Sequence, residues 1–147
     1  MNGRISNDHH TLTERVYFEH TDFSGVVYHT RYLDFLEHGR SDYVRMLGVH
    51  HRELAGGVYG ESLAFAVHHM DIAFKAAARI DDVLTVTTHK ARREGIRLHL
   101  HQTIHRGDVL LIDAHVVLVL VNTEGKPRRF PTKLIALLEA EPSDRTD

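Results

Sequence analysis

The chain contains no cysteine. This absence excludes disulfide bonds, thiolate metal ligands and a cysteine nucleophile. Proline is scarce, with three residues among 147, and 42% of the residues are hydrophobic. Neither a disordered nor a fibrous protein has such a composition. The length predicts a single domain that spans residues 1–147.

Long hydrophobic runs are also absent. The longest, residues 116–121, is far shorter than the roughly 20 apolar residues that a membrane-spanning helix needs. Residues 1–10 are polar and lack the apolar core of a secretory signal. We therefore expect a soluble, cytoplasmic protein that does not insert into a membrane.

Neither sign of charge dominates the chain. Lysine and arginine number 18 against 20 aspartates and glutamates, which gives a net charge of −2. Such a balance provides no overall field for nucleic acid, so we expect no nucleic-acid partner. Histidine, in contrast, is abundant, with 14 residues spread along the sequence. They make the surface charge responsive between about pH 5 and 8, but abundance alone defines no site.

One segment has the pattern of a long helix. Apolar residues recur at three- and four-residue spacing through residues 31–47, with Thr30 as the expected N-cap and Gly48 as the stop. Residues 48–62 contain four glycines and predict a long loop. A short closing helix is expected at residues 130–138.

The rest of the chain has the character of β-strands. Strands are expected at residues 12–18, 63–75, 83–92, 96–105 and 109–121. A loose arm is expected at residues 1–10 and a polar tail at residues 139–147. One amphipathic helix packed on a five-stranded antiparallel sheet is an α+β fold of two layers.

The last of these strands is apolar on both faces. Leu110, Ile112 and Ala114 begin one apolar series, and Val109 and Leu111 begin the other. One apolar face of the strand can pack against the helix, but the other needs a second element that shields it from water. A homo-oligomer is the simplest source of that cover.

The densest chemistry lies at residues 15–29, Arg-Val-Tyr-Phe-Glu-His-Thr-Asp-Phe-Ser-Gly-Val-Val-Tyr-His. This segment is similar to the signature of the hotdog-fold acyl-CoA thioesterases of the 4-hydroxybenzoyl-CoA thioesterase type, specifically their Tol–Pal-associated subgroup. The matching residues are Arg15-Val16-Tyr17, Glu19, Thr21-Asp22, Gly25-Val26-Val27-Tyr28-His29, Tyr32-Leu33, Glu37 and Arg40. A weaker likeness extends over roughly residues 12–135. Phe18 and His20 depart from the family, which often has a tyrosine and an acidic residue there.

The resemblance implies a hotdog fold, in which a curved antiparallel sheet wraps one long central helix. Dimers of such folds form by sheet extension and often pair into tetramers. The implied enzyme is a hydrolase that converts an acyl-CoA into a free acid and coenzyme A. Coenzyme A then enters as part of the substrate, and no other cofactor is expected. Asp22 and His29 match the catalytic positions. Gly25, Val27 and Tyr28 match the substrate-binding loop, with the N–H groups near Val27 and Tyr28 as oxyanion donors.

The residues themselves support this chemistry. A carboxylate on a glycine-containing loop before a helix faces unpaired backbone N–H groups. Each such donor to a developing oxyanion typically contributes about 10²–10³ in rate. Asp22 either attacks the thioester carbon or activates water as a general base, while His29 orients that water or carries the proton. Glu37, within the predicted helix, is a second candidate base, although a structural hydrogen bond is its simpler role.

Basic residues are needed for the phosphates of coenzyme A. Arg92 and Arg93, beside the turn at Glu94-Gly95, are expected to bind them. The cluster around Arg128 and Arg129 is the alternative. We expect the acyl chain to lie against the apolar helix face and the loop at residues 48–62. The sequence does not rank short aliphatic, long aliphatic and aromatic acyl groups.

Other histidines are candidate metal ligands. His99, His101 and His105 share one face of a predicted strand, but alternation of polar residues explains them equally well, and no metal is expected. Asp113 and His115 lie on the valine-rich face of the last strand and are expected to pair across an oligomer interface. Two other functions of the same fold stay open, a hydratase or dehydratase acting on acyl thioesters and a non-catalytic acyl-CoA-binding protein.

Overall fold

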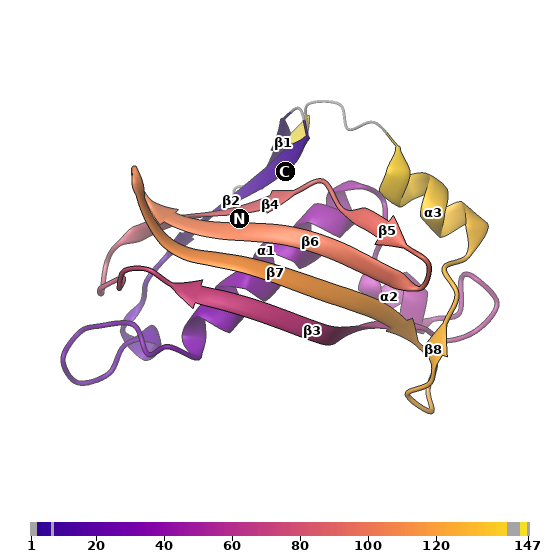
Figure 1. Ribbon diagram of the computed structural model, residues 1–147, viewed down its shortest axis with the longest axis horizontal. Coiled ribbons are helices and arrows are strands. Elements are labelled where there is room, and N and C mark those ends of the chain that lie inside the picture. Colours follow the sequence, from indigo (N-terminus) through magenta and orange to yellow (C-terminus); the bar gives the residue numbers. More distant parts are fainter. Residues whose placement is uncertain (1–2, 7, 141–144, 147) are drawn as a thin grey trace.

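A computed structural model describes residues 3–6, 8–140 and 145–146 (Figure 1). The long strands are β2 (His9–Arg15), β3 (Ala64–Phe74), β4 (Val83–His89), β6 (Arg97–Arg106) and β7 (Val109–Val121). The short strands are β1 (Arg4–Ser6), β5 (Arg92–Glu94), β8 (Pro127–Arg128) and β9 (Arg145–Thr146). The helices are α1 (Arg31–Met46), α2 (His51–Ala55), α3 (Thr132–Glu139) and the 3-10 turn η1 (Phe18–His20).

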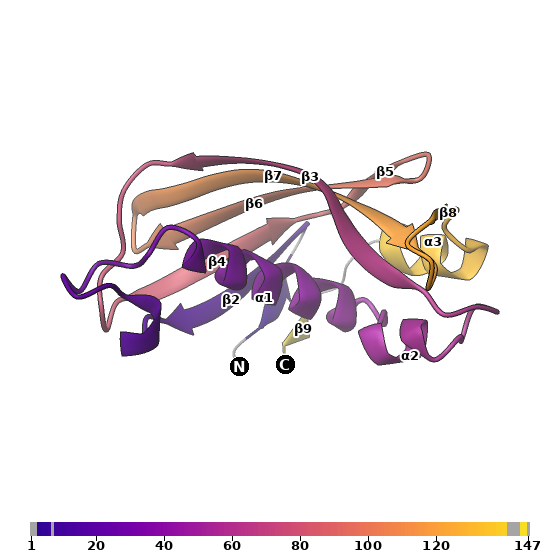
Figure 2. The ribbon, with the colours of Figure 1, turned by 90° about the horizontal axis from the view of Figure 1, so that it is seen from below.

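The strands form one curved sheet in the order β3-β7-β6-β4-β2-β1-β9, with β5 beside β6 and β8 beside β7. Every pairing is antiparallel. The sheet curves around α1, which lies along its concave face (Figure 2). The predicted α+β arrangement and its five main strands are confirmed, and the four short strands lengthen the sheet.

Several expected boundaries are wrong. Residues 1–10 are not a loose arm throughout, because β1 pairs with β2 and buries Ile5 to 1% exposure. The strand expected at residues 12–18 starts earlier and ends at Arg15. The strand expected at residues 83–92 divides into β4 and β5, with the buried Ala91 between them.

The loop and the tail also differ from expectation. The loop expected at residues 48–62 contains α2, which forms because Leu54 is buried in the core. Of the tail expected at residues 139–147, Glu139 closes α3 and β9 pairs with β1. Residues 141–144 and 147 of that tail lie outside the described residues.

The amphipathic pattern of α1 explains its position. Its apolar stripe is buried against the sheet, with Tyr32, Phe35 and Leu36 each at most 3% exposed. Thr30 occupies the N-cap position as expected, but its side chain makes no capping hydrogen bond. Gly48 adopts a φ of +98° just after the helix, a backbone conformation that favours glycine and stops the helix.

The middle of α1 lies very close to the sheet. A Cβ atom at Gly39 would stand 2.6 Å from Cγ1 of Val86, so only glycine fits there without rearrangement. The side-chain amide of Gln102 donates a hydrogen bond of 2.9 Å to the Leu36 carbonyl and a second of 2.9 Å to Oγ1 of Thr88. The helix is therefore fixed to β4 and β6 by both packing and hydrogen bonds.

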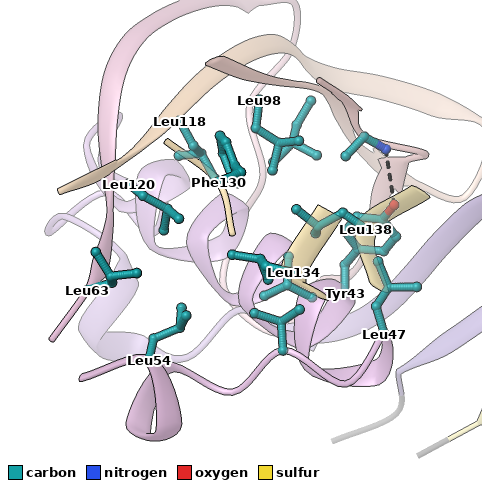
Figure 3. Close-up of a cluster of buried hydrophobic side chains, with 14 of the residues drawn as sticks. Tyr43, Leu47, Leu54, Leu63, Leu98, Leu118, Leu120, Phe130, Leu134 and Leu138 are labelled. Carbon is teal, nitrogen blue, oxygen red and sulfur yellow. Dashed lines mark hydrogen bonds between the residues drawn. The ribbon is translucent and has the colours of Figure 1, made fainter. Parts of the chain in front are cut away.

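The core consists of two clusters of buried side chains. One surrounds Tyr32 and Phe35 near the start of α1. The other surrounds the end of α1 and is closed by Leu54 of α2 and Leu134 of α3 (Figure 3). In that cluster the hydroxyl of Tyr43 accepts a hydrogen bond of 3.0 Å from the N–H of Ala91.

The second face of β7 is not left open as the sequence suggested. Val117 and Val119 are only 4% and 6% exposed within the single chain, so this face by itself requires no partner. The open part of the sheet is instead β3, which stands at the end of the strand order. No strand in the described part of the chain pairs with its outer edge, and Val67 and Phe74 are about half exposed.

Candidate active site

The signature loop at residues 20–29 lies at one end of the sheet, between η1 and α1 (Figures 1 and 2). It rests on the connection between β3 and β4. The Val27 N–H donates to the Ala78 carbonyl at 2.9 Å, and the Ile80 N–H donates to the Gly25 carbonyl at 3.0 Å. These long-range contacts hold the loop in place next to the first turn of α1.

Asp22 stands exposed in this loop. One of its carboxylate oxygens accepts hydrogen bonds from the backbone N–H of Ser24, at 2.8 Å, and from the Ser24 hydroxyl. These hydrogen bonds, that of the hydroxyl first, hold the pKa of the carboxyl below its usual value. The Gly25 N–H donates to the Asp22 carbonyl, and Gly25 itself adopts a φ of +84° that completes the turn. Asp22 is therefore ionised at neutral pH, as a nucleophile or a general base must be.

The amides of the loop are not arranged as the sequence suggested. The N–H of Val27 is taken by Ala78, and the N–H of Tyr28 donates to the His20 carbonyl at 3.0 Å. Neither is free to bind an oxyanion. In the part of the chain that the structure describes, the next two amides, those of His29 and Thr30, have no hydrogen-bond acceptor. They are among the open donors at the N-terminal end of α1.

A cavity of about 290 Å³ lies beside His29. Its walls are mainly apolar and include Val27, Tyr32 and Phe74. The rings of His29 and Phe74 meet edge to face, with centroids 6.4 Å apart. Lys75 also lines this cavity, a residue to which the sequence analysis assigned no role. An apolar cavity with one imidazole at its edge suits an acyl group whose reacting carbon lies near His29.

His20, where the family often has an acidic residue, has a structural role. Its Nδ1 accepts a hydrogen bond of 2.8 Å from the Tyr17 N–H, and its ring packs edge-on against Phe35. Burial, followed by the nearby charge of Arg31, lowers its pKa. His20 therefore stays neutral at neutral pH and supports the loop through its carbonyl bond to Tyr28.

The basic residues expected to bind coenzyme A lie elsewhere. Arg92 and Arg93 belong to β5, at the opposite end of the sheet from the signature loop (Figure 1). Arg93 also forms an ion pair with Glu139 of α3, at 3.3 Å. A single chain therefore does not bring Arg92 and Arg93 next to Asp22. In the alternative cluster, Arg128 is paired with Glu61 at 3.0 Å.

Glu37 is not part of the same arrangement either. It is exposed on α1, eight residues after His29, which corresponds to about 12 Å along a helix. It lines a second cavity, next to Arg40, rather than the one beside His29.

The histidines of the neighbouring strands β6 and β7 have partners within the chain. His99 and His115 lie 3.0 Å apart between ring nitrogens, and His101 bonds Asp113 at 2.7 Å. Asp113 and His115, which we expected to pair across an oligomer interface, thus find partners in their own chain. No group of three metal-ligating side chains occurs among the described residues. No described helix is long and apolar enough to cross a membrane.

Comparison with known proteins identifies relatives of this chain. Residues 16–138 match the family model of the thioesterase-like superfamily. The chain is 37% identical over 123 residues to an acyl-CoA thioesterase, YbgC, of Haemophilus influenzae, covering 83% of this chain and 88% of the relative. It is 36% identical over 124 residues to the acyl-CoA thioester hydrolase YbgC of Escherichia coli O157:H7, covering 83% of this chain and 90% of the relative.

Solved structures of thioesterases superpose on this chain. A probable thioesterase from Bartonella henselae superposes with a TM-score of 0.81 at 49% identity, covering 84% of this chain and 99% of that one. A variant of 4-hydroxybenzoyl-CoA thioesterase in complex with 4-hydroxybenzoyl-CoA superposes with a TM-score of 0.80 at 20% identity, covering 90% and 99%. At that lower identity the likeness concerns the fold.

Proposed function

The chain belongs to the thioesterase-like superfamily, and because its curated relatives are acyl-CoA thioester hydrolases, we propose that it hydrolyses an acyl-CoA to a free carboxylic acid and coenzyme A. Its hotdog fold is that of this family. One observation supports the reaction above all others. An ionised carboxylate, Asp22, stands on the loop that leads into open amides at the start of α1, beside the cavity at His29.

The reaction begins with the thioester carbonyl at the N-terminal end of α1. The amides of His29 and Thr30 donate to the oxygen as negative charge develops on it, and the positive end of the helix dipole adds to their effect. Once a nucleophile has added to the carbonyl carbon, the C–S bond breaks and the thiolate of coenzyme A leaves. Because a thiolate is a good leaving group, this step requires neither a metal ion nor a strong general acid.

Asp22 acts in one of two ways at this carbon. As a nucleophile it forms an acyl anhydride and releases the thiolate, and water then hydrolyses the anhydride to restore the carboxylate. As a general base it takes a proton from water while the resulting hydroxide adds to the carbonyl, and the proton passes to the departing sulfur. His29, which lines the cavity, orients the water or carries the proton in either case.

We further propose that the protein is cytoplasmic and forms a dimer or tetramer. The unpaired outer edge of β3 supports the second part of this proposal. An edge of 11 residues presents a row of free backbone donors and acceptors that a second copy can pair by extending the sheet. Coenzyme A is bound only as part of the substrate.

The test is thiol release from a panel of acyl-CoA substrates by the wild type and by Asp22→Asn. The substitution keeps the shape of the side chain and removes its charge and basicity. We expect turnover to fall at least about 10²-fold, which corresponds to roughly 2.7 kcal/mol of barrier. Asp108→Asn, which changes an exposed carboxylate in the turn between β6 and β7, serves as the matched control and retains wild-type turnover.

The panel also separates the competing functions. A hydratase would consume the enoyl absorbance without releasing thiol, and a binding protein would bind coenzyme A without turnover. Either result would contradict the hydrolase, and equal turnover by wild type and Asp22→Asn would remove Asp22 from the reaction. The substrate with the highest kcat/KM identifies the acyl group.

A further inference from the structure

The cavity beside His29 is small and largely apolar. Its volume of about 290 Å³ lies just below the range of about 300–1,000 Å³ that is common for small-molecule sites. The rings of Tyr32 and Phe74 stand on its wall and meet edge to face, with centroids 6.0 Å apart. A cavity of this size suits a short acyl group, whereas the nucleotide part of coenzyme A is much larger.

One lysine lines the same cavity. Lys75 follows Phe74, the last residue of β3, and belongs to the connection that leads to β4. None of the described residues that line the cavity is an aspartate or a glutamate. A lysine ammonium is positively charged at neutral pH and offers three hydrogen-bond donors and no acceptor. The cavity therefore joins apolar walls to a positive charge.

The charge of Lys75 is not neutralised by its own chain. In the described part of the chain, no carboxylate oxygen lies within 4.0 Å of the ammonium. The nearby Arg106 differs, because its guanidinium forms an ion pair with Asp82 at 3.1 Å. Lys75 is thus available to an anion that comes from outside the chain.

The backbone around Lys75 is fixed to the neighbouring strands. The N–H of Lys75 donates to the Leu111 carbonyl at 2.8 Å. Two residues later, the Ala77 carbonyl accepts a hydrogen bond of 3.0 Å from Arg106. This wall of the cavity is therefore held in place, while the flexible four-carbon stem of the lysine lets its ammonium follow the end of a bound group.

The proposed reaction determines which part of the substrate meets Lys75. The thioester carbonyl lies at the open amides of His29 and Thr30, so the acyl chain extends from there into the cavity. The methylene groups of the chain pack against the aromatic rings, and the far end of the chain is left for the ammonium. A carboxylate at that end accepts charge-assisted hydrogen bonds from Lys75, whereas a methyl group accepts none.

We propose that this cavity selects acyl groups that end in a carboxylate, and that the Lys75 ammonium binds this carboxylate. The substrate class is then the coenzyme A monothioester of a short dicarboxylic acid. The inference rests on the hydrolase proposed above and names its acyl group. An ammonium also binds phosphates, but the small volume and the apolar walls of the cavity favour the acyl group over the phosphates of coenzyme A.

Binding of two coenzyme A thioethers tests the proposal by isothermal titration calorimetry. S-(4-carboxybutyl)-coenzyme A and S-pentyl-coenzyme A carry the same number of acyl-chain carbons and differ only in the terminal carboxylate. Neither contains a thioester, so neither is hydrolysed. We expect the wild type to bind the carboxylated thioether at least about 10-fold more tightly, because a hydrogen bond between two charged groups is among the strong ones.

Substitutions of Lys75 locate the source of this preference. Lys75→Met keeps the length of the side chain and removes its charge, so we expect it to weaken binding of the carboxylated thioether alone and to make the two Kd values equal. Lys75→Arg retains the positive charge and the preference. Lys133→Met, which changes an exposed lysine of α3, is the matched control and leaves both Kd values unchanged. Equal weakening of both thioethers by Lys75→Met would place Lys75 at the phosphates and overturn the proposal.

The wild type decides the question even if a variant does not fold, which circular dichroism establishes. Equal Kd values of the wild type for the two thioethers overturn the proposal. Thiol release from glutaryl-coenzyme A and pentanoyl-coenzyme A is measured separately, and we expect kcat/KM to be at least about 10-fold higher for the first. Release from neither contradicts the proposed hydrolase, whereas the thioethers still test Lys75, so the two failures are distinguishable.

Discussion

The hydroxyl of Tyr32 accepts a hydrogen bond from the backbone N–H of Ala78, with 2.8 Å between the two atoms. The carbonyl of the same Ala78 accepts the N–H of Val27, in the loop that holds Asp22. Ala78 therefore joins the first turn of α1 to the loop that holds Asp22. This one residue, buried between β3 and β4, sets the position of the open amides of α1 relative to the Asp22 loop.

Tyr32→Phe tests this connection. The substitution leaves a buried N–H at Ala78 without an acceptor, which costs about 1–3 kcal/mol of unfolding free energy. We expect urea denaturation to show that loss and thiol release to show a lower kcat. Tyr43→Phe is the matched control, since the Tyr43 hydroxyl accepts the Ala91 N–H in the cluster at the other end of the helix. It should reduce stability by a similar amount and leave kcat unchanged. Equal kcat losses in both variants would show that Tyr32 has no specific role at the site.

Ser24→Ala tests the ionisation of Asp22. The Ser24 hydroxyl is the first cause of the lowered pKa of Asp22, and its removal raises that pKa toward the usual value. In the proposed reaction the ionised carboxylate of Asp22 is the active form, so activity is lost as the pH falls through this pKa. The acid limb of the kcat/KM profile should therefore move to higher pH, while activity near pH 7 changes little.

The control for this profile is Ser62→Ala, which removes a hydroxyl in the connection before β3. Its acid limb should coincide with that of the wild type. An acid limb that stays in place in Ser24→Ala would mean that it reports a group other than Asp22.

Gly39→Ala tests the close approach of α1 to the sheet. The added methyl group would stand 2.6 Å from Cγ1 of the fully buried Val86, so either the helix or the strand must shift. Overpacking of this kind typically destabilises by about 1–3 kcal/mol, and this loss exceeds the gain that alanine offers in a helix. Thermal unfolding should show the lower stability. Val86→Ala in the same chain makes room for the methyl group, so the two losses should be less than additive. Strict additivity would contradict the contact.

Local patterns determined the secondary structure because they need no information from distant residues. The spacing of Tyr32, Phe35 and Leu36 on one stripe was sufficient to predict α1, and Gly48 was sufficient to place its end. The strands were predictable for the same reason. The boundaries near Ile5 and Ala91 were not, because each depends on a strand or cluster that is distant in the sequence.

The candidate site was likewise predictable from the sequence only in part. The sequence could place Asp22 and His29 in one segment, since both belong to the stretch that leads into α1. Which amides are open could not, because the N–H of Val27 is taken by Ala78, some fifty residues away. For the same reason the sequence placed Arg92 at the site, whereas the sheet places it at the opposite end of the molecule.

The sequence by itself determined that this chain folds as one helix against an antiparallel sheet and carries the Asp22 signature of its family. Only the tertiary structure decided which surfaces are left open. Val117 and Val119 of β7 are covered within the chain, whereas the edge of β3 is not. The physical reason is that periodicity records which residues avoid water, but the element that covers each of them is chosen by contacts between distant parts of the chain.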